Sequence, residues 1–420
     1  MAAFRPFAAL RPAKELASQV AALPYDVVTR EEAKKIGEEN PYSFLHVDRA
    51  EIDLDPQIDP YSPQVYEKAR ETLKKMEQDG IMRKDPSPRY YIYQQQMKEY
   101  VQTGLVGCAS IDDYLNNVVK RHELTREEKE QDRIRHVDVC DANTGPIFLT
   151  GWFPMELIEL RNRWIEEHEA EYDFTAEDGI VHRVWVIDDP DTIRLVEDYA
   201  EKIPSLYIAD GHHRAASAVK VGEKRRQEHP GYTGEEEFNY FLSVLFPCRH
   251  MQILPYNRVV RDKNGFEEKA ILNMVKLNFE LLFFPGFPCK PIEPHCFGMY
   301  MGGQWYHLRA REESYDHEDP IASLDVSILQ KNLLDPILGI KDPRTDERIR
   351  FVGGIKGLKE LESMADQTDG IAFSMYPTTI EELMAIADAG EIMPPKSTWF
   401  EPKLRSGLFI HELGTDKEEN

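Results

Sequence analysis

The sequence predicts an α/β (α+β) protein that is divided into two domains. Strand-like and helix-like segments alternate along its N-terminal part, and the alternation starts again after a turn-like stretch at residues 263–265. A chain of 420 residues is also longer than one ordinary hydrophobic core requires. We therefore expect an N-terminal domain over residues 1–260 and a C-terminal α/β domain over residues 261–420.

The first eighty residues contain signals for two strands and two helices. Residues 5–10 and 43–47 have the short apolar runs that are typical of strands. Thr29 occupies the position of a helix N-cap, and Glu32, three residues later, completes a capping box. Segment 62–80 is the second predicted helix, because serine and proline begin it and glycine ends it.

Strands and helices continue to alternate through the rest of the chain. Residues 89–97 and 100–111 are rich in aromatic and β-branched side chains, and the two polar residues between them predict a β-hairpin. A second hairpin is predicted at 296–310, with its turn at two glycines. The other predicted segments are a loop and helix at 121–133, a turn and strand at 143–153, a helix at 164–171, a strand at 182–189, a helix at 193–203 and a strand at 238–246.

Residues 205–221, SLYIADGHHRAASAVKV, contain four ionisable side chains within a single turn. An apolar strand is followed by a glycine turn and a small, alanine-rich helix, and the start of such a helix attracts anions. The arginine offers a planar fork to phosphate oxygens, the histidines add donors or proton carriers, and the aspartate suits Mg²⁺. The pattern favours a phosphate-binding catalytic turn over an ordinary strand–helix corner. The residues concerned are Asp210, which is also the predicted metal ligand, Gly211, His212, His213 and Arg214.

Composition and charge limit the partners that this chain can bind. The formal net charge is −24, and the basic residues occur only in short runs beside acids. A nucleic-acid surface needs clustered Lys and Arg, so we expect no nucleic-acid partner. The chain has no apolar run long enough for a membrane span and no secretory signal near its start, and its five cysteines are scattered. We expect a cytoplasmic protein with no membrane partner. The sequence is compatible with a homo-oligomer.

Several motifs occur in the order that is typical of one known family. They are FRPFAALRP, LPYDVVTREEA, NPYSFLHVDR, RHELT, NTGPIF, ADGHHRAAS, ILPYNRVV and PPKSTWFEPKLRSGL. With these motifs the chain resembles, over nearly its full length, the bacterial and archaeal domain-of-unknown-function family one-thousand-and-fifteen. The ADGHHR turn is also similar to the phosphate-binding turn of the ParB/sulfiredoxin-like superfamily, whose free serine kinases share the DGHHR string. The resemblance implies a mixed-sheet, ParB/sulfiredoxin-like core in the N-terminal domain.

The resemblance also implies a role for the RHELT motif. In free serine kinases a His-Glu pair precedes the turn, and its glutamate is similar in role to a general base for the serine hydroxyl. Carried over, this role falls on Glu123. On the sequence alone, the stronger interpretation of Glu123 is that it flanks the acidic helix that follows. His122 and Thr125 of the same motif are assigned to substrate binding, although a long insertion separates RHELT from ADGHHR.

Five further residues complete the predicted site. Lys129 and Arg133 are four residues apart on one helix face, where they could clamp a second phosphate or simply be solvated. Arg5 and Asp26 belong to family-like motifs and are assigned to substrate binding, although Asp26 also suits a turn acceptor. Asn143 lies in a turn where it could contact a ligand or form a plain turn. Family-like residues of the C-terminal part are Arg258, Lys396, Ser397 and Lys403.

Three functions are compatible with these residues. The first is a small-molecule kinase that uses Mg²⁺ and transfers phosphoryl from ATP, ADP or pyrophosphate to a free hydroxyl, for which the resemblance implies L-serine. The second is a non-enzymatic nucleotide-binding regulator of the ParB type. The third is a metal-dependent phosphohydrolase built on the aspartate and histidines of the turn. We favour the kinase, with a small phosphorylated ligand and an amino-acid substrate as partners. The sequence has no P-loop, G-x-S-x-G or H-E-x-x-H motif.

Overall fold

The computed structural model describes residues 2–283 and 287–414, and the chain forms two compact units. The first unit combines the described residues of Met1–Met251 and Pro402–Asn420, and the second unit is Gln252–Glu401. These ranges differ from the expected 1–260 and 261–420 chiefly at the C-terminal end. Residues 402–414, which we call the return segment, belong to the first unit because their backbone pairs with its N-terminal residues. Ser406 bridges to Ala22 and Ile410 to Leu10.

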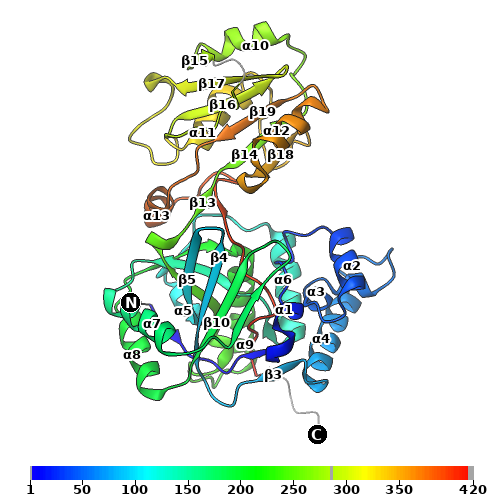
Figure 1. Cartoon of the computed structure of the whole chain (residues 1–420), viewed down its shortest axis with the longest axis vertical. Helices are drawn as coiled ribbons and strands as arrows, with labels where there is room; N and C mark the ends of the chain where they lie inside the picture. The colour runs from blue at the N-terminus through cyan, green and yellow to red at the C-terminus, as the bar shows by residue number, and fades with distance from the viewer. Residues whose placement is uncertain (1, 284–286, 415–420) are drawn as a thin grey trace. The chain divides into compact units, whose positions relative to one another are not determined.

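A mixed β-sheet forms the centre of the first unit (Figure 1). In the described residues it has nine strands in the order β6-β11-β8-β12-β5-β4-β10-β9, with β1 paired to β5. Strand β11 is parallel to β6 and antiparallel to β8, which confirms the α/β (α+β) class with a mixed sheet. The bounds are β1 Phe4–Arg5, β4 Tyr90–Met97, β5 Tyr100–Ser110, β6 Val119–Lys120, β8 Ile147–Gly151, β9 Tyr172–Thr175, β10 Val181–Ile187, β11 Leu206–Asp210 and β12 Tyr240–Pro247.

Helices surround this sheet. In Figure 1, α7 and α8 lie on one side of the first unit, and α2, α3 and α4 gather beside α6 on the other. The bounds are α1 Ala17–Val20, α2 Arg30–Glu39, α3 Leu45–Asp48, α4 Pro63–Gln78, α5 Ile111–Leu115, α6 Glu127–Cys140, α7 Met155–Glu167, α8 Pro190–Ala200 and α9 His212–Glu228. Two short ribbons complete the unit, β2 Leu10–Pro12 with β3 Met82–Lys84 and β7 Ala142–Asn143 with β21 His411–Glu412. No helix in the described ranges has the length and apolarity of a membrane span.

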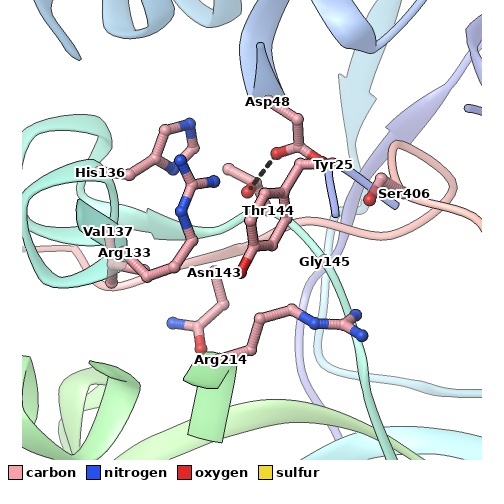
Figure 2. Close-up of a pocket in the computed structure, with 10 residues that line it drawn as sticks. All are labelled: Tyr25, Asp48, Arg133, His136, Val137, Asn143, Thr144, Gly145, Arg214 and Ser406. Carbon is pink, nitrogen blue, oxygen red and sulfur yellow. Dashed lines mark hydrogen bonds between the residues drawn. The ribbon is translucent and has the colours of Figure 1, made fainter. Parts of the chain in front are cut away.

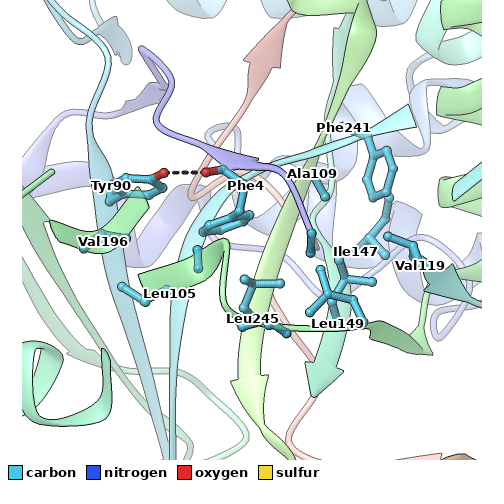
Figure 3. Packing of buried hydrophobic residues seen from close by; sticks show 14 of the residues in the cluster. Phe4, Tyr90, Leu105, Ala109, Val119, Ile147, Leu149, Val196, Phe241 and Leu245 are labelled. Carbon is cyan, nitrogen blue, oxygen red and sulfur yellow. Dashed lines mark hydrogen bonds between the residues drawn. The ribbon is translucent and has the colours of Figure 1, made fainter. Parts of the chain in front are cut away.

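Two large hydrophobic cores and a small cluster of Val137, Val221, Phe238 and Leu413 hold the described part of the first unit together. The larger core packs the sheet against α7, α8 and α9, and Figure 3 shows Phe4, Leu105 and Leu245 within it. The Tyr90 hydroxyl donates a 2.6 Å hydrogen bond to the Phe4 carbonyl, which holds β1 on the sheet. The smaller core joins α2, α3 and α4 to Ile410. The return segment is therefore part of the interior of the first unit.

The second unit is a separate α/β body. Among its described residues, a six-stranded sheet has the order β15-β17-β16-β19-β14-β18, and the predicted hairpin at 296–310 is confirmed as β16 and β17. Gly302 and Gly303 form its turn with φ values of 59° and 75°, a region that glycine adopts readily. The bounds are β13 Ile253–Leu254, β14 Tyr256–Val260, α10 Glu268–Val275, β15 Phe279–Phe283, β16 Cys296–Met301, β17 Gln304–Ala310, α11 Asp325–Leu329, β18 Ile349–Gly353, α12 Gly357–Asp366, β19 Ile371–Met375, α13 Ile380–Asp388 and β20 Trp399–Phe400.

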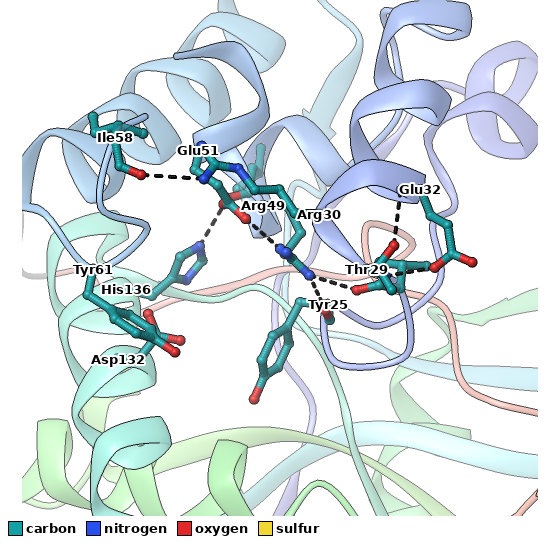
Figure 4. Close-up of polar contacts among 12 residues, drawn as sticks. Tyr25, Thr29, Arg30, Glu32, Arg49, Glu51, Ile58, Tyr61, Asp132 and His136 are labelled. Atoms are coloured by element: carbon teal, nitrogen blue, oxygen red, sulfur yellow. Dashed lines mark hydrogen bonds and ion pairs between the residues drawn. The ribbon is translucent and has the colours of Figure 1, made fainter. Parts of the chain in front are cut away.

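Most local predictions are confirmed, and three differ from the structure. The single strand expected at 5–10 is absent, because β1 ends at Arg5 and β2 begins at Leu10. Helix α2 begins with the expected capping box, in which the Thr29 hydroxyl accepts the Glu32 N–H and the Glu32 carboxylate accepts the Thr29 N–H (Figure 4). The strand expected at 43–47 is instead the one-turn helix α3, whose first residues are held by the Ser43 hydroxyl. The helix expected at 164–171 runs over Met155–Glu167. A short apolar run is compatible with both helix and strand, which explains the error at α3.

Candidate functional site

The strand–turn–helix predicted around Gly211 is present. Strand β11 ends at Asp210, Gly211 has a left-handed backbone with φ 95°, and α9 begins at His212. A Cβ atom at position 211 would lie 3.1 Å from the Arg214 Nε atom. Glycine is therefore required both by the backbone conformation and by the close approach of the arginine. The turn places the first free N–H groups of a 17-residue helix directly after a carboxylate.

The Asp210 carboxylate lies between two cationic side chains. Arg214 Nη2 is 3.3 Å from its Oδ2 atom, and Lys403 Nζ is 3.6 Å from its Oδ1 atom. The Asp210 side chain keeps 31% of its exposure, whereas Lys403 and Arg214 keep 11% each. Lys403 comes from the return segment, so residues on both sides of the second unit in the sequence meet at this carboxylate.

Arg214 also lines a cavity of the first unit (Figure 2). The cavity is small and partly open to solvent. The Arg214 guanidinium donates to the Pro146 carbonyl, and a Cβ at Gly145 would lie 3.5 Å from Arg214 Nη1 and 3.2 Å from Ser406 Oγ. The lining residues are Tyr25, Asp48, Arg133, His136, Val137, Asn143, Thr144, Gly145, Arg214 and Ser406.

The cavity contains both positive and negative groups. The Arg133 guanidinium lies 4.1 Å from the centre of the Tyr25 ring, and its Nε atom donates to Asp132 at 2.9 Å. The buried Asp48 carboxylate accepts a 2.8 Å hydrogen bond from the Thr144 hydroxyl, as Figure 2 shows. Such a mixture of fixed charges suits a ligand that itself carries both signs of charge.

Two further features prepare the cavity for a ligand. The side chain of Asn143 is buried, and its Nδ2 donor has no hydrogen-bond partner among the residues that the structure describes. A buried donor without an acceptor is costly, so a ligand atom that accepts from it would be stabilised. The backbone of Tyr25 is held by Arg49, whose Nη1 atom donates to the carbonyls of Tyr25 and Val28 at 2.8 Å each (Figure 4).

The RHELT loop adjoins the opposite side of the turn. The Oε2 atom of Glu123 lies 3.7 Å from the Nδ1 atom of His212. The His122 ring stands nearly perpendicular to the His212 ring, with centroids 4.5 Å apart. The backbone N–H of Arg126 donates to His213 Nε2 at 3.0 Å, which ties the loop to α9. The structure thus brings together RHELT and the turn, which are distant in sequence.

Burial keeps two of these histidines uncharged near neutral pH. Burial lowers the pKa of His122 to about 4, although the Asp210 carboxylate acts in the opposite direction. Burial also lowers the pKa of His212 well below its ordinary value, and the neighbouring His122 and His213 act in the same direction. The Glu123–His212 contact is therefore a carboxylate beside a neutral imidazole. At 3.7 Å the contact between Glu123 and His212 is too long for a hydrogen bond.

Lys129 and Arg133, the predicted phosphate clamp, have different surroundings. The Lys129 ammonium donates to the Tyr61 hydroxyl at 2.8 Å, whereas Arg133 is buried and lines the cavity. Neither Lys129 nor Glu123 is among the residues that line this cavity in the described part of the chain. Asp26, next to Tyr25, is exposed. The roles of these side chains in binding stay predictions.

Two other predicted residues have protein partners. The Arg5 guanidinium forms two hydrogen bonds with Glu235, at 2.5 and 2.9 Å, and lies 4.6 Å from the centre of the Tyr240 ring. The Thr125 hydroxyl donates to the Glu130 carboxylate. Both contacts account for these residues without a ligand, and their assignment to substrate binding stays a prediction.

Sequence reasoning did not single out much of the cavity lining. The missed residues are Tyr25, Asp48, His136, Val137, Thr144, Gly145 and Ser406. A signal was available for most of them, because four of the motif segments that carry the family resemblance each supply at least one: LPYDVVTREEA, NPYSFLHVDR, NTGPIF and PPKSTWFEPKLRSGL. Motifs that are far apart in sequence thus converge on one cavity, and that convergence is invisible until the fold is known.

Comparisons with known proteins identify a family. A family model described as a protein of unknown function, DUF1015, matches residues 4–327. None of the curated proteins gives a match. Among solved structures, a free serine kinase in complex with AMP is 15% identical, with 71% of this chain and 90% of that chain covered and a TM-score of 0.34.

Two other solved structures have a similar degree of overlap. SbnI with a C-terminal truncation from Staphylococcus aureus is 11% identical, with 74% and 90% of the two chains covered and a TM-score of 0.39. A conserved hypothetical protein from Pyrococcus furiosus is 14% identical, with 74% and 96% covered and a TM-score of 0.34. At these values the solved structures carry no argument about the activity of this chain.

Proposed function

We propose that this chain, which belongs to the family of proteins of unknown function DUF1015, is a small-molecule phosphotransferase. It would transfer a phosphoryl group from ATP, ADP or pyrophosphate to a free hydroxyl, with L-serine as the acceptor. The observation that best supports this proposal is that the Glu123 carboxylate lies 3.7 Å from His212, in the turn that we propose binds the anion. One carboxylate and the anion donors of α9 therefore lie at the same turn.

Phosphoryl transfer depends mainly on positioning and charge neutralisation, which this turn can supply. The N-terminus of α9 and the Arg214 fork would bind phosphate oxygens. Glu123, with 41% of its side chain exposed, would accept the proton of the attacking hydroxyl. The neutral His212 beside it would leave the negative charge of that carboxylate in place for proton transfer.

The charges of the cavity support an amino-acid acceptor. Arg133 would attract the α-carboxylate, and the buried Asp48 would attract the ammonium group. Asn143 would donate the hydrogen bond that lacks an acceptor in the described residues. The choice of serine among amino acids rests on the likeness of the ADGHHR and RHELT motifs to those of free serine kinases.

Mg²⁺ fits this site as a partner of the donor. Among residues 2–283 and 287–414, no group of three or more His, Cys, Asp and Glu side chains is placed to hold a metal ion. Mg²⁺ is commonly held by one or two carboxylates together with phosphates and waters, and Asp210 has a partly exposed carboxylate for this purpose. When bound, the ion would neutralise charge on the transferred phosphoryl group.

Product analysis tests the proposal directly. The protein is incubated with L-serine, Mg²⁺ and either ATP, ADP or pyrophosphate, and phosphoserine is detected by phosphorus NMR and mass spectrometry. We expect phosphoserine with at least one donor and none without serine. Donor binding without turnover would instead indicate a regulatory nucleotide-binding protein, and phosphate release without an acceptor would indicate a phosphohydrolase.

A further inference from the structure

We infer that the return segment completes the anion site, with Lys403 and Ser406 binding phosphate oxygens of the donor beside Arg214. This inference rests on the proposed function, because it assigns further residues to the same site. These two side chains are connected to Arg214 through different neighbours. Lys403 adjoins it through the shared carboxylate of Asp210, and Ser406 adjoins it across Gly145.

Lys403 has the position and chemistry of a phosphate ligand. Its ammonium lies 3.6 Å from Asp210 Oδ1, at the end of the strand that leads into the turn, and only 11% of its side chain is exposed. An ammonium has three donors, so one lysine can contact carboxylate and phosphate oxygens at the same time. A compact point charge and the planar fork of Arg214 are complementary ways to neutralise a diphosphate.

Ser406 brings a hydroxyl to the same anion site. It is buried, it lines the cavity together with Arg214, and its Oγ atom would lie 3.2 Å from a Cβ at Gly145. The serine hydroxyl and the guanidinium therefore both border the space that the missing side chain of Gly145 leaves. A hydroxyl can donate to a phosphate oxygen while the arginine binds a second one.

The backbone of the return segment is fixed at each of these positions. Gln95 Nε2 donates to the Lys403 carbonyl at 2.8 Å, and Gln102 Nε2 donates to the Pro402 carbonyl at 3.2 Å. Ser406 exchanges backbone hydrogen bonds of 2.9 and 3.1 Å with Ala22. Side chains presented by a backbone held at several points are preorganised for binding.

The neighbouring Arg405 secures the segment from the other side. Its guanidinium forms an ion pair with Asp178, and its Nε atom donates to His182 Nε2 at 3.3 Å. Burial lowers the pKa of His182 to about 3, so the imidazole is neutral and can accept this bond. Arg405 is thus occupied by structural contacts, whereas Lys403 lies beside Asp210 and Ser406 lines the cavity.

Calorimetric titration with pyrophosphate tests the inference without requiring turnover. We compare wild type with Lys403→Met, with Lys403→Arg, and with Lys202→Met as a control at an exposed lysine of the same unit. Loss of one charged hydrogen bond predicts roughly ten- to hundredfold weaker binding for Lys403→Met. Lys403→Arg should recover most of the affinity, and Lys202→Met should bind like wild type. A Ser406→Ala variant should bind about three- to tenfold more weakly, because a neutral hydrogen bond is lost.

Pyrophosphate binding by Lys403→Met within twofold of wild type, with Arg214→Ala strongly impaired, would overturn the inference. If Lys403→Met does not fold, acetylation of the wild-type protein decides the question. Pyrophosphate should slow the labelling of Lys403 relative to Lys202, and equal rates with and without it would contradict the assignment. If wild type binds pyrophosphate but forms no phosphoserine, the kinase proposal fails while the assignment of Lys403 is still tested by binding.

Discussion

Glu123 and His212 lie side by side, with Oε2 and Nδ1 3.7 Å apart, although one belongs to a loop and the other begins helix α9. Since burial keeps the imidazole neutral near neutral pH, this contact contributes little electrostatic energy to the folded state. The carboxylate is also 41% exposed. Its removal should therefore affect chemistry far more than stability.

Glu123→Gln should lower phosphoserine formation by roughly 10²–10⁴, the range that a positioned general base contributes. The melting temperature and the affinity for pyrophosphate should stay near the wild-type values. Glu128→Gln, at an exposed position in the first turn of α6, is the matched control and should keep its activity. Near-normal phosphoserine formation by Glu123→Gln would place the base elsewhere, and Asp26 would be the next residue to test.

Asp210→Asn should separate metal-dependent turnover from simple anion binding. The amide keeps the shape of the side chain but removes the charge between Lys403 and Arg214. Turnover with Mg²⁺ should fall by roughly 10²-fold or more, because metal-bound charge stabilisation is worth several kcal/mol. Binding of pyrophosphate without Mg²⁺ should be unchanged or tighter, since a competing carboxylate is gone. Weaker metal-free binding in this variant would contradict the assignment of Asp210 as the metal ligand.

Two glycine substitutions distinguish backbone strain from a local effect on Arg214. Gly211 and Gly179 both have positive φ, of 95° and 79°, so alanine at either position should destabilise the fold by roughly 1–2 kcal/mol. A Cβ at Gly211 would lie 3.1 Å from Arg214 Nε, whereas at Gly179 no heavy atom of the described residues lies within 4 Å. Urea unfolding should show similar losses for both variants, and calorimetry should show weaker pyrophosphate binding only for Gly211→Ala. Equal affinities would indicate that Arg214 does not bind the anion.

Acid should destabilise the protein through its buried histidines. Burial lowers the pKa of His122 to about 4 in the folded state, whereas an unfolded histidine titrates near about 6.5. Between these values the unfolded chain binds more protons, so the free energy of unfolding falls by about 1.4 kcal/mol per pH unit for this group as the pH decreases. Urea unfolding of wild type and His122→Gln between about pH 7 and 4 checks this, and the variant should show a shallower slope. If the free energy of unfolding changes equally with pH in wild type and His122→Gln, the pKa of His122 is the same in the folded and unfolded states.

Elements with local signals could be predicted from the sequence. The capping box of Thr29 and Glu32, the hairpin of β4 and β5 and the turn at Gly211 depend on residues a few positions apart, and all three are confirmed. The helix α3 was missed because its single turn has no periodic pattern to distinguish it from a strand. Local chemistry thus accounts for the turn and for the side chains that it presents.

The cavity could not be predicted in the same way, because its lining comes from segments that are far apart in sequence. Asp48 meets Thr144 across 96 positions, and Gln95 meets Lys403 across 308 positions. Neither residue of such a pair has a neighbour in sequence that reveals its partner. Lys129 and Arg133 do lie four residues apart on one helix, as predicted. Lys129 contacts Tyr61 whereas Arg133 is buried, and the spacing alone does not predict this difference.

The return segment has a consequence for how this protein is made. Lys403 and Ser406 leave the ribosome only after the whole of Gln252–Glu401 has been translated. At roughly 5–20 residues per second, that stretch takes on the order of ten to thirty seconds to synthesise. During this interval the nascent first unit lacks the return segment, whose Ser406 and Ile410 bridge to Ala22 and Leu10. Catalytic competence would therefore arise late, near the end of translation.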